Sequence, residues 1–116
     1  MRRYLAVLLA LSLAACAAHA PLATVSHVDL TRYAGTWYEI ARLPNRFERG
    51  CVAVSATYTA RPDGRIDVLN QCREERLDGT LDEAHAVARV VDDATNAKLA
   101  VQFFWPFSGD YWVIAL

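Results

Sequence analysis

The sequence predicts an all-β protein whose strands follow one another as an antiparallel up-and-down meander. Five short runs between residues 51 and 116 alternate between apolar and polar side chains or are rich in β-branched and aromatic residues. Turn-forming groups separate these runs, among them Arg61-Pro62-Asp63-Gly64 and Asp78-Gly79. After residue 20 the chain has no helical periodicity, and only one helical turn is expected there, over residues 29–33.

The composition fits one folded domain. The chain has 116 residues, of which 54% are hydrophobic and 22% are charged, so it is not an intrinsically disordered sequence. Lysine and arginine number 12 against 13 aspartates and glutamates, which leaves a net charge of −1. A protein without a basic excess has little attraction for a phosphate backbone, and we therefore expect no nucleic-acid partner.

Residues 1–15 predict a secretory signal helix. Arg2 and Arg3 supply the positive start, and an uncharged run rich in leucine and alanine follows over residues 4–15. This run is too short to span a bilayer, which takes about 20 apolar residues. The signal predicts export from the cytoplasm.

Two cleavage sites compete at the end of this signal. Ala18-His19-Ala20 has the small-residue pattern of an ordinary site, but Pro21 follows it. Leu13-Ala14-Ala15-Cys16 resembles a bacterial lipobox, in which the cysteine is acylated with chains such as palmitate and becomes the first mature residue. We favour the lipobox, with Cys16 as the membrane anchor and residues 16–28 as a tether. Ala17 resembles the residue that follows the cysteine in outer-membrane lipoproteins, so we expect a bacterial cell-envelope protein at the outer membrane, facing the periplasm.

The other two cysteines, Cys51 and Cys72, favour a disulfide. An exported protein lies in an oxidising compartment, where paired cysteines usually bond. A turn centred between Pro62 and Asp63 places the two cysteines on one face of a hairpin, one diagonal step apart. Two free thiols remain an alternative. A metal site is weaker, because two cysteines without a histidine cluster do not fill one.

The strands are expected in order over residues 51–60, 65–72, 84–91, 98–104 and 110–116, with a turn or loop over 105–109. Alternation places Ala84, Ala86, Ala88 and Val90 on one face of the third strand, and Leu99, Val101 and Phe103 on one face of the fourth. A meander protects its edges most completely by closing into a barrel. A barrel with a ligand cavity takes about eight strands.

The segment Gly35-Thr36-Trp37-Tyr38-Glu39-Ile40-Ala41-Arg42 resembles the first signature of the lipocalin family. Residues 43–50 and 103–116 resemble the bacterial outer-membrane lipoproteins of that family. The resemblance implies an eight-stranded up-and-down barrel with a cup for a small apolar ligand. It also implies structural roles for the motif residues, with Gly35 allowing a tight chain entry and Trp37 packing across the closed base.

Two later motifs of that family, one around a T-D-Y and one with an arginine near the last strand, do not occur before Leu116. We therefore expect residues 29–116 to form a partial lipocalin barrel. It would hold five of the eight strands, A to E, without the last three strands and the C-terminal helix. This expectation treats the sequence as a fragment.

The resemblance implies binding of a small hydrophobic ligand, such as a fatty acid or a lysophospholipid, in lipid storage or transport and membrane maintenance. Candidate cup residues on the strands are Tyr58, Val87, Phe103 and Tyr111. The alternatives are a non-catalytic envelope interaction module and a non-functional fragment. No oligomeric state follows from these motifs.

We expect no enzymatic activity. The sequence contains no G-x-S-x-G, H-E-x-x-H or phosphate-binding loop, and no residue is assigned a catalytic role. His27 and His85 are isolated from other candidate catalytic groups and are interpreted as surface residues. No cofactor or metal is expected.

Overall fold

The computed structural model describes residues 20–116. The predicted signal helix and the lipidated Cys16 lie outside these residues. Within them, one six-stranded antiparallel sheet has the order β1-β2-β3-β4-β5-β6, so each strand pairs with the next. The elements are α2 (Leu30–Tyr33), β1 (Gly35–Tyr38), β2 (Cys51–Ala60), β3 (Ile66–Glu74), β4 (Leu81–Val90), β5 (Lys98–Phe104) and β6 (Phe107–Trp112). The predicted all-β meander is confirmed.

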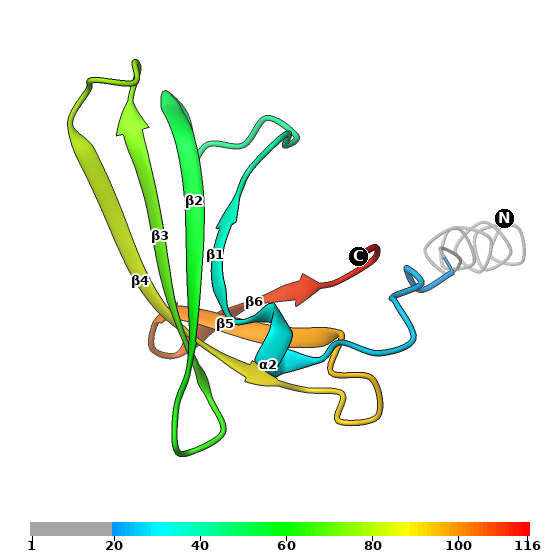
Figure 1. Cartoon of the computed structure of the whole chain (residues 1–116). Coiled ribbons are helices and arrows are strands. Elements are labelled where there is room, and N and C mark those ends of the chain that lie inside the picture. Colours follow the sequence, from blue (N-terminus) through cyan, green and yellow to red (C-terminus); the bar gives the residue numbers. More distant parts are fainter. Residues whose placement is uncertain (1–19) are drawn as a thin grey trace, which may run out of the picture.

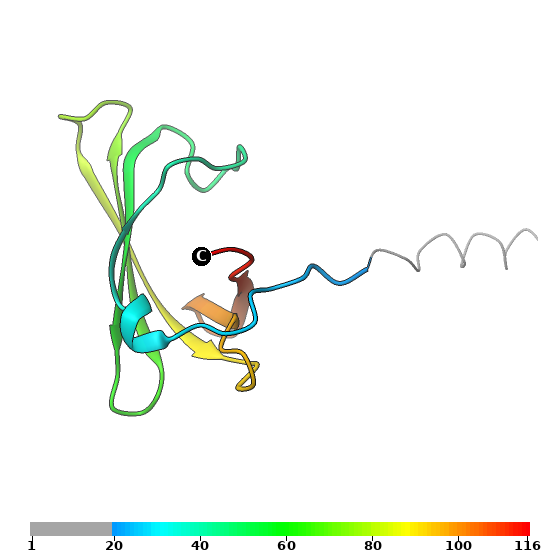
Figure 2. The same cartoon turned by 45° about the vertical axis from the view of Figure 1, so that its right-hand side comes forward.

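The sheet is strongly curved. Strands β1 to β4 stand side by side, and β5 and β6 cross behind them at a steep angle (Figure 1). Seen from the side, the sheet bends around a concave face, and the C-terminal end of the chain lies in front of that face (Figure 2). Helix α2 lies at the β2–β3 turn end of the sheet, and its N-cap Asp29 accepts hydrogen bonds from the backbone N–H groups of Thr31 and Arg32.

Strands β1 and β6 differ most from the sequence expectation. Residues Gly35–Tyr38 form a strand, β1, which pairs with β2 from Gly35↔Tyr58 to Tyr38↔Ser55. The last strand begins at Phe107 and ends at Trp112, because Phe104 and Phe107 pair directly across a short turn. The expected turn over 105–109 is therefore confined to two residues between β5 and β6.

The register of the β2–β3 hairpin depends on a β-bulge. Ala60 pairs with Ile66, which is one residue away from the register expected for a turn centred at 62–63. A one-residue slip would turn every side chain of one strand to the opposite face. The register shifts back between Val52 and Ser55, where Ala53 has a φ of 50°, and Cys51 then pairs with Glu74. The bulge thus returns Cys51 to the face of Cys72.

The buried residues form two clusters. The first, on the concave side of the sheet, contains Val68, Ala86, Ala88 and Leu99. The second contains Val28, Ala97 and Val113. Backbone hydrogen bonds join Val25 N to Val113 O at 3.0 Å and Val28 N to Thr95 O at 2.7 Å. The last residues of the expected tether, from Val25 onward, therefore pack on the sheet.

Candidate ligand-binding site

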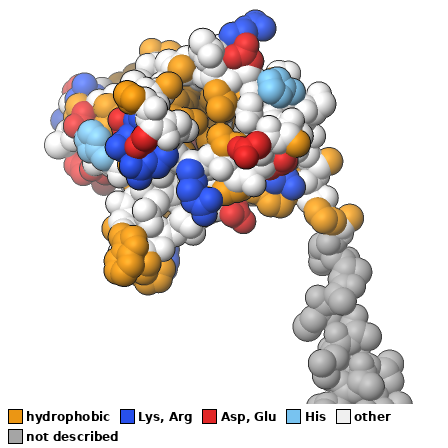
Figure 3. Space-filling model, turned by 90° about the horizontal axis from the view of Figure 1, so that it is seen from below, with side chains coloured by type: hydrophobic (Ala, Val, Ile, Leu, Met, Phe, Trp, Pro, Cys, Tyr) orange, Lys and Arg blue, Asp and Glu red, His pale blue; other side chains and the backbone are white. Residues whose placement is uncertain are grey.

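The concave face of the sheet encloses a hollow of about 1380 Å³. All six strands and helix α2 contribute side chains to it. Seen from below, hydrophobic side chains occupy the recess and charged side chains surround it (Figure 3). A concave, mainly apolar surface with a few polar groups is the usual form of a small-molecule site.

Short side chains leave the space for this hollow. Strand β4 contributes Ala84 and Ala88, and β6 contributes Gly109. Larger apolar side chains, among them Leu99 and Val101 of β5, line the same surface. The alternation predicted for β4 and β5 therefore places the small side chains where a ligand needs room.

Three tyrosines meet inside the hollow, and we call Tyr33, Tyr58 and Tyr111 the phenol cluster. The hydroxyl oxygens of Tyr33 and Tyr111 lie 2.8 Å apart, and the Tyr58 hydroxyl donates to that of Tyr111 at 3.3 Å. The ring centroids of Tyr33 and Tyr58 are 5.5 Å apart, and those of Tyr58 and Tyr111 are 6.2 Å apart. The cluster joins α2, β2 and β6 through polar groups within an apolar surface.

The surroundings of Tyr33 and Tyr58 keep these two phenols protonated. Burial raises the pKa of both Tyr33 and Tyr58, and the hydrogen bond of each to Tyr111 raises it further. Removing a proton would place a phenolate in a poorly hydrated site beside other phenol oxygens. At neutral pH both hydroxyls are therefore neutral and able to donate.

Trp37 stacks on the phenol cluster. Its ring lies 4.6 Å from that of Tyr33, with an interplanar angle of 27°, and its Nε1–H donates to the Tyr33 carbonyl oxygen at 2.8 Å. Gly35 has a φ of +112°, so a residue with a side chain would be strained at the bend between α2 and β1. The two motif residues therefore fix the indole against α2, while the side chain of Tyr38 is exposed.

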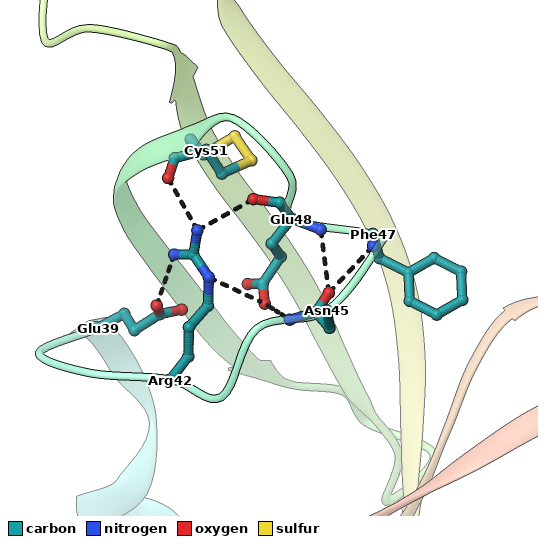
Figure 4. Close-up of a disulfide and its surroundings, with 7 residues drawn as sticks. Glu39, Arg42, Asn45, Phe47, Glu48 and Cys51 are labelled. Atoms are coloured by element: carbon teal, nitrogen blue, oxygen red, sulfur yellow. Dashed lines mark hydrogen bonds and ion pairs between the residues drawn. A yellow bond between two sulfur atoms is a disulfide. The ribbon is translucent and has the colours of Figure 1, made fainter.

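The opposite end of the hollow is organised around the disulfide between Cys51 and Cys72 and the guanidinium of Arg42 (Figure 4). Arg42 bonds to the Glu39 carboxylate at 2.7 Å and to the carbonyl oxygens of Glu48 and Cys51, each at 3.0 Å. The Glu39 carboxylate raises the pKa of the Arg42 guanidinium. One side chain thus fastens both ends of the β1–β2 loop.

The sequence candidates divide between the two faces of the sheet. Tyr58 and Tyr111 line the hollow, and Phe103 borders both the hollow and the outer depression. Val87 pairs with Asp67 and Gln102 and lies on the opposite face, where it lines a small outer depression of about 320 Å³. Tyr33 is not among the cup residues predicted from the sequence; its position four residues before Trp37 is the one signal for it there.

Residues 20–116 contain no helix that is both long and apolar enough to cross a membrane. In the same part of the chain, no three histidine, cysteine, aspartate or glutamate side chains gather in a way that could hold a metal ion.

Known proteins resemble this chain over most of its length. The outer membrane lipoprotein Blc of Escherichia coli (strain K12) is 43% identical over 105 residues, which cover 88% of this chain and 59% of that protein. Blc of Vibrio cholerae is 46% identical over 92 residues, covering 79% of this chain and 53% of that protein. Apolipoprotein D of Macaca fascicularis is 43% identical over 88 residues, covering 75% of this chain and 45% of that protein.

The chain thus spans little more than half the length of these curated bacterial relatives. A family model described as a lipocalin-like domain matches residues 28–116. That match begins at the buried Val28, the first residue of the cluster that attaches the N-terminal segment to the sheet, and it includes strands β1 to β6. With these strands, this hollow and this match, the chain belongs to the lipocalin family.

Proposed function

We propose that this lipocalin binds a small hydrophobic ligand, such as a fatty acid or a lysophospholipid, on the concave face of its sheet. The observation that carries the proposal is the hollow of about 1380 Å³, whose surface is mainly apolar. Each methylene group that moves from water into such a site contributes about 0.8 kcal/mol. An acyl chain can therefore bind without any charged partner.

Displacement of a dye tests this function. N-phenyl-1-naphthylamine, a neutral apolar dye, should bind the purified protein, and palmitic acid or palmitoyl lysophosphatidylcholine should displace it. Failure of the dye and of both lipids to bind would refute ligand binding and favour a non-catalytic interaction module.

Two neighbouring substitutions show whether the ligand occupies the hollow. Ala84 lines the hollow, whereas His85 lines the outer depression, because successive strand residues point to opposite faces. Ala84→Trp should fill part of the hollow and weaken dye binding about tenfold, whereas His85→Trp should leave it unchanged. Equal effects of the two variants would contradict binding on the concave face. Circular dichroism checks that both variants keep their β-structure.

We further propose that acyl chains on Cys16 anchor the protein at the outer membrane, with the domain in the periplasm. The supporting observation is the segment Leu13-Ala14-Ala15-Cys16, together with the relatives that are named outer membrane lipoproteins. Labelled palmitate should enter the wild-type protein and a Cys51→Ala/Cys72→Ala variant, but not Cys16→Ala. An unlabelled mature protein beginning at Pro21 would instead establish cleavage after Ala20.

A further inference from the structure

The phenol cluster has three hydroxyl protons but only two hydrogen bonds among its hydroxyls, so one proton is not donated within the cluster. Each hydroxyl can donate one hydrogen bond and accept two. Tyr58 uses its proton on the Tyr111 oxygen, and a second proton lies between Tyr33 and Tyr111. Whichever of these two donates, the hydroxyl proton of the other has no acceptor among residues 20–116.

This proton lies at a defined end of the hollow. Tyr58 pairs with Gly35, the first residue of β1 and two positions after the end of α2, whereas Cys51 and its disulfide lie at the other end of β2. Cys51 lies seven positions before Tyr58 on β2, a length of about 23 Å at 3.3 Å per residue. The hollow therefore offers a hydroxyl group at its α2 end. Between that end and the disulfide, its lining includes the apolar Val54, Ala56 and Ala84 beside the amides of Asn70 and Gln71.

We propose that the unused phenol proton of the cluster binds a carboxylate, so that the protein prefers long-chain carboxylic acids held with the carboxyl group at the α2 end. The alkyl chain would then extend along the hollow toward the disulfide. This inference rests on the proposed function, because it assigns a chemical class and an orientation to the same ligand.

The strength of the hydrogen bond gives the expected selectivity. A bond from a neutral donor to an ionised acceptor is roughly twice as strong as one between neutral groups. The carboxylate should therefore bind about fivefold to tenfold more tightly than the methyl ester of the same chain. The phosphocholine group of a lysophospholipid is too bulky to lie among three packed aromatic rings, so this lipid should bind more weakly than the acid.

The test compares palmitic acid, methyl palmitate and palmitoyl lysophosphatidylcholine as competitors of N-phenyl-1-naphthylamine. The decisive variant is Tyr33→Phe/Tyr58→Phe/Tyr111→Phe, which removes all three donors and keeps the rings. Tyr38→Phe is the control, since it removes the same hydroxyl from a tyrosine that borders the hollow outside the cluster.

The expected result is a preference for the acid in the wild-type protein and in the Tyr38→Phe control, and loss of that preference in the triple variant. Equal binding of acid and ester by the wild-type protein would overturn the inference, and so would an unchanged preference in the triple variant. In both cases the proposed function would stand. Failure of the dye and of all three lipids to bind would instead remove the proposed function.

Nuclear magnetic resonance provides a measurement that needs no folded variant. In a complex of the wild-type protein with ¹³C-labelled palmitate, tyrosine ring protons should show Overhauser contacts to the methylene beside the carboxyl group. Contacts to the terminal methyl group in its place would show the opposite orientation and refute the inference.

Discussion

Replacement of both Cys51 and Cys72 by alanine should lower the free energy of unfolding substantially. The disulfide joins residues 21 positions apart, and closing a loop of that length in the unfolded chain corresponds to about 3 kcal/mol at 25 °C. The bond also holds β2 to β3 beside the bulge, where the regular ladder is interrupted between Val52 and Ser55. Fewer backbone hydrogen bonds between β2 and β3 are therefore available there to compensate for loss of the disulfide.

Urea unfolding followed by circular dichroism measures this effect. With a slope of about 1–3 kcal/mol per molar urea, the transition midpoint should fall by about 1–3 M. Reductant should move the wild-type midpoint toward that of the double variant and leave the double variant unchanged, which controls for effects of the reductant itself. Midpoints that agree within error would refute the argument that this loop closure stabilises the fold.

Three further changes have defined outcomes. Ala53→Val should lower the free energy of unfolding by about 1–2 kcal/mol, because a β-branched residue is strained at a φ of 50°. Equal urea midpoints would contradict this. Gly79→Ala should destabilise the protein, since its Cβ would collide with backbone carbonyl oxygens of the β3–β4 turn, whereas Gly109→Ala has open space and should not. Similar melting temperatures of the two glycine variants would exclude that collision. Stability should fall as pH rises above 10.0, the ordinary pKa of tyrosine, because Tyr33 and Tyr58 keep their protons in the folded protein after the unfolded chain has lost them. Urea midpoints between about pH 8 and 11 measure that loss, and a constant midpoint would contradict it.

The strand pattern was largely predictable because period-two alternation is a local property. The face formed by Ala84, Ala86 and Ala88 was read directly from the sequence, and two of these alanines are buried in the structure. Strand β1 was missed because its four residues have no alternation of their own and become a strand through pairing with β2. The bulge at Ala53 was also missed, since no glycine marks it.

The cavity residues were harder to predict than the strands. Val87 was predicted to line the cup but lies on the outer face, because alternation sorts strand residues into two faces without showing which face is concave. A ligand cavity needs small side chains on the face toward the ligand, whereas a packed protein core usually has bulky apolar side chains at such inward positions. The contact of Tyr33 with Tyr111 joins residues 78 positions apart, and only the curvature of the sheet brings them together.

Because Trp37 stacks on Tyr33 beside the hollow, its fluorescence should report on occupancy of the hollow. Of the three tryptophans, Trp105 lies in the exposed β5–β6 turn and Trp112 lies under the ammonium of Lys98, whereas the indole of Trp37 borders the hollow. Replacing Trp105 and Trp112 by phenylalanine would leave a single emitter beside the phenol cluster. Its emission maximum should shift to shorter wavelength as a ligand displaces water, so occupancy could be followed without any added label.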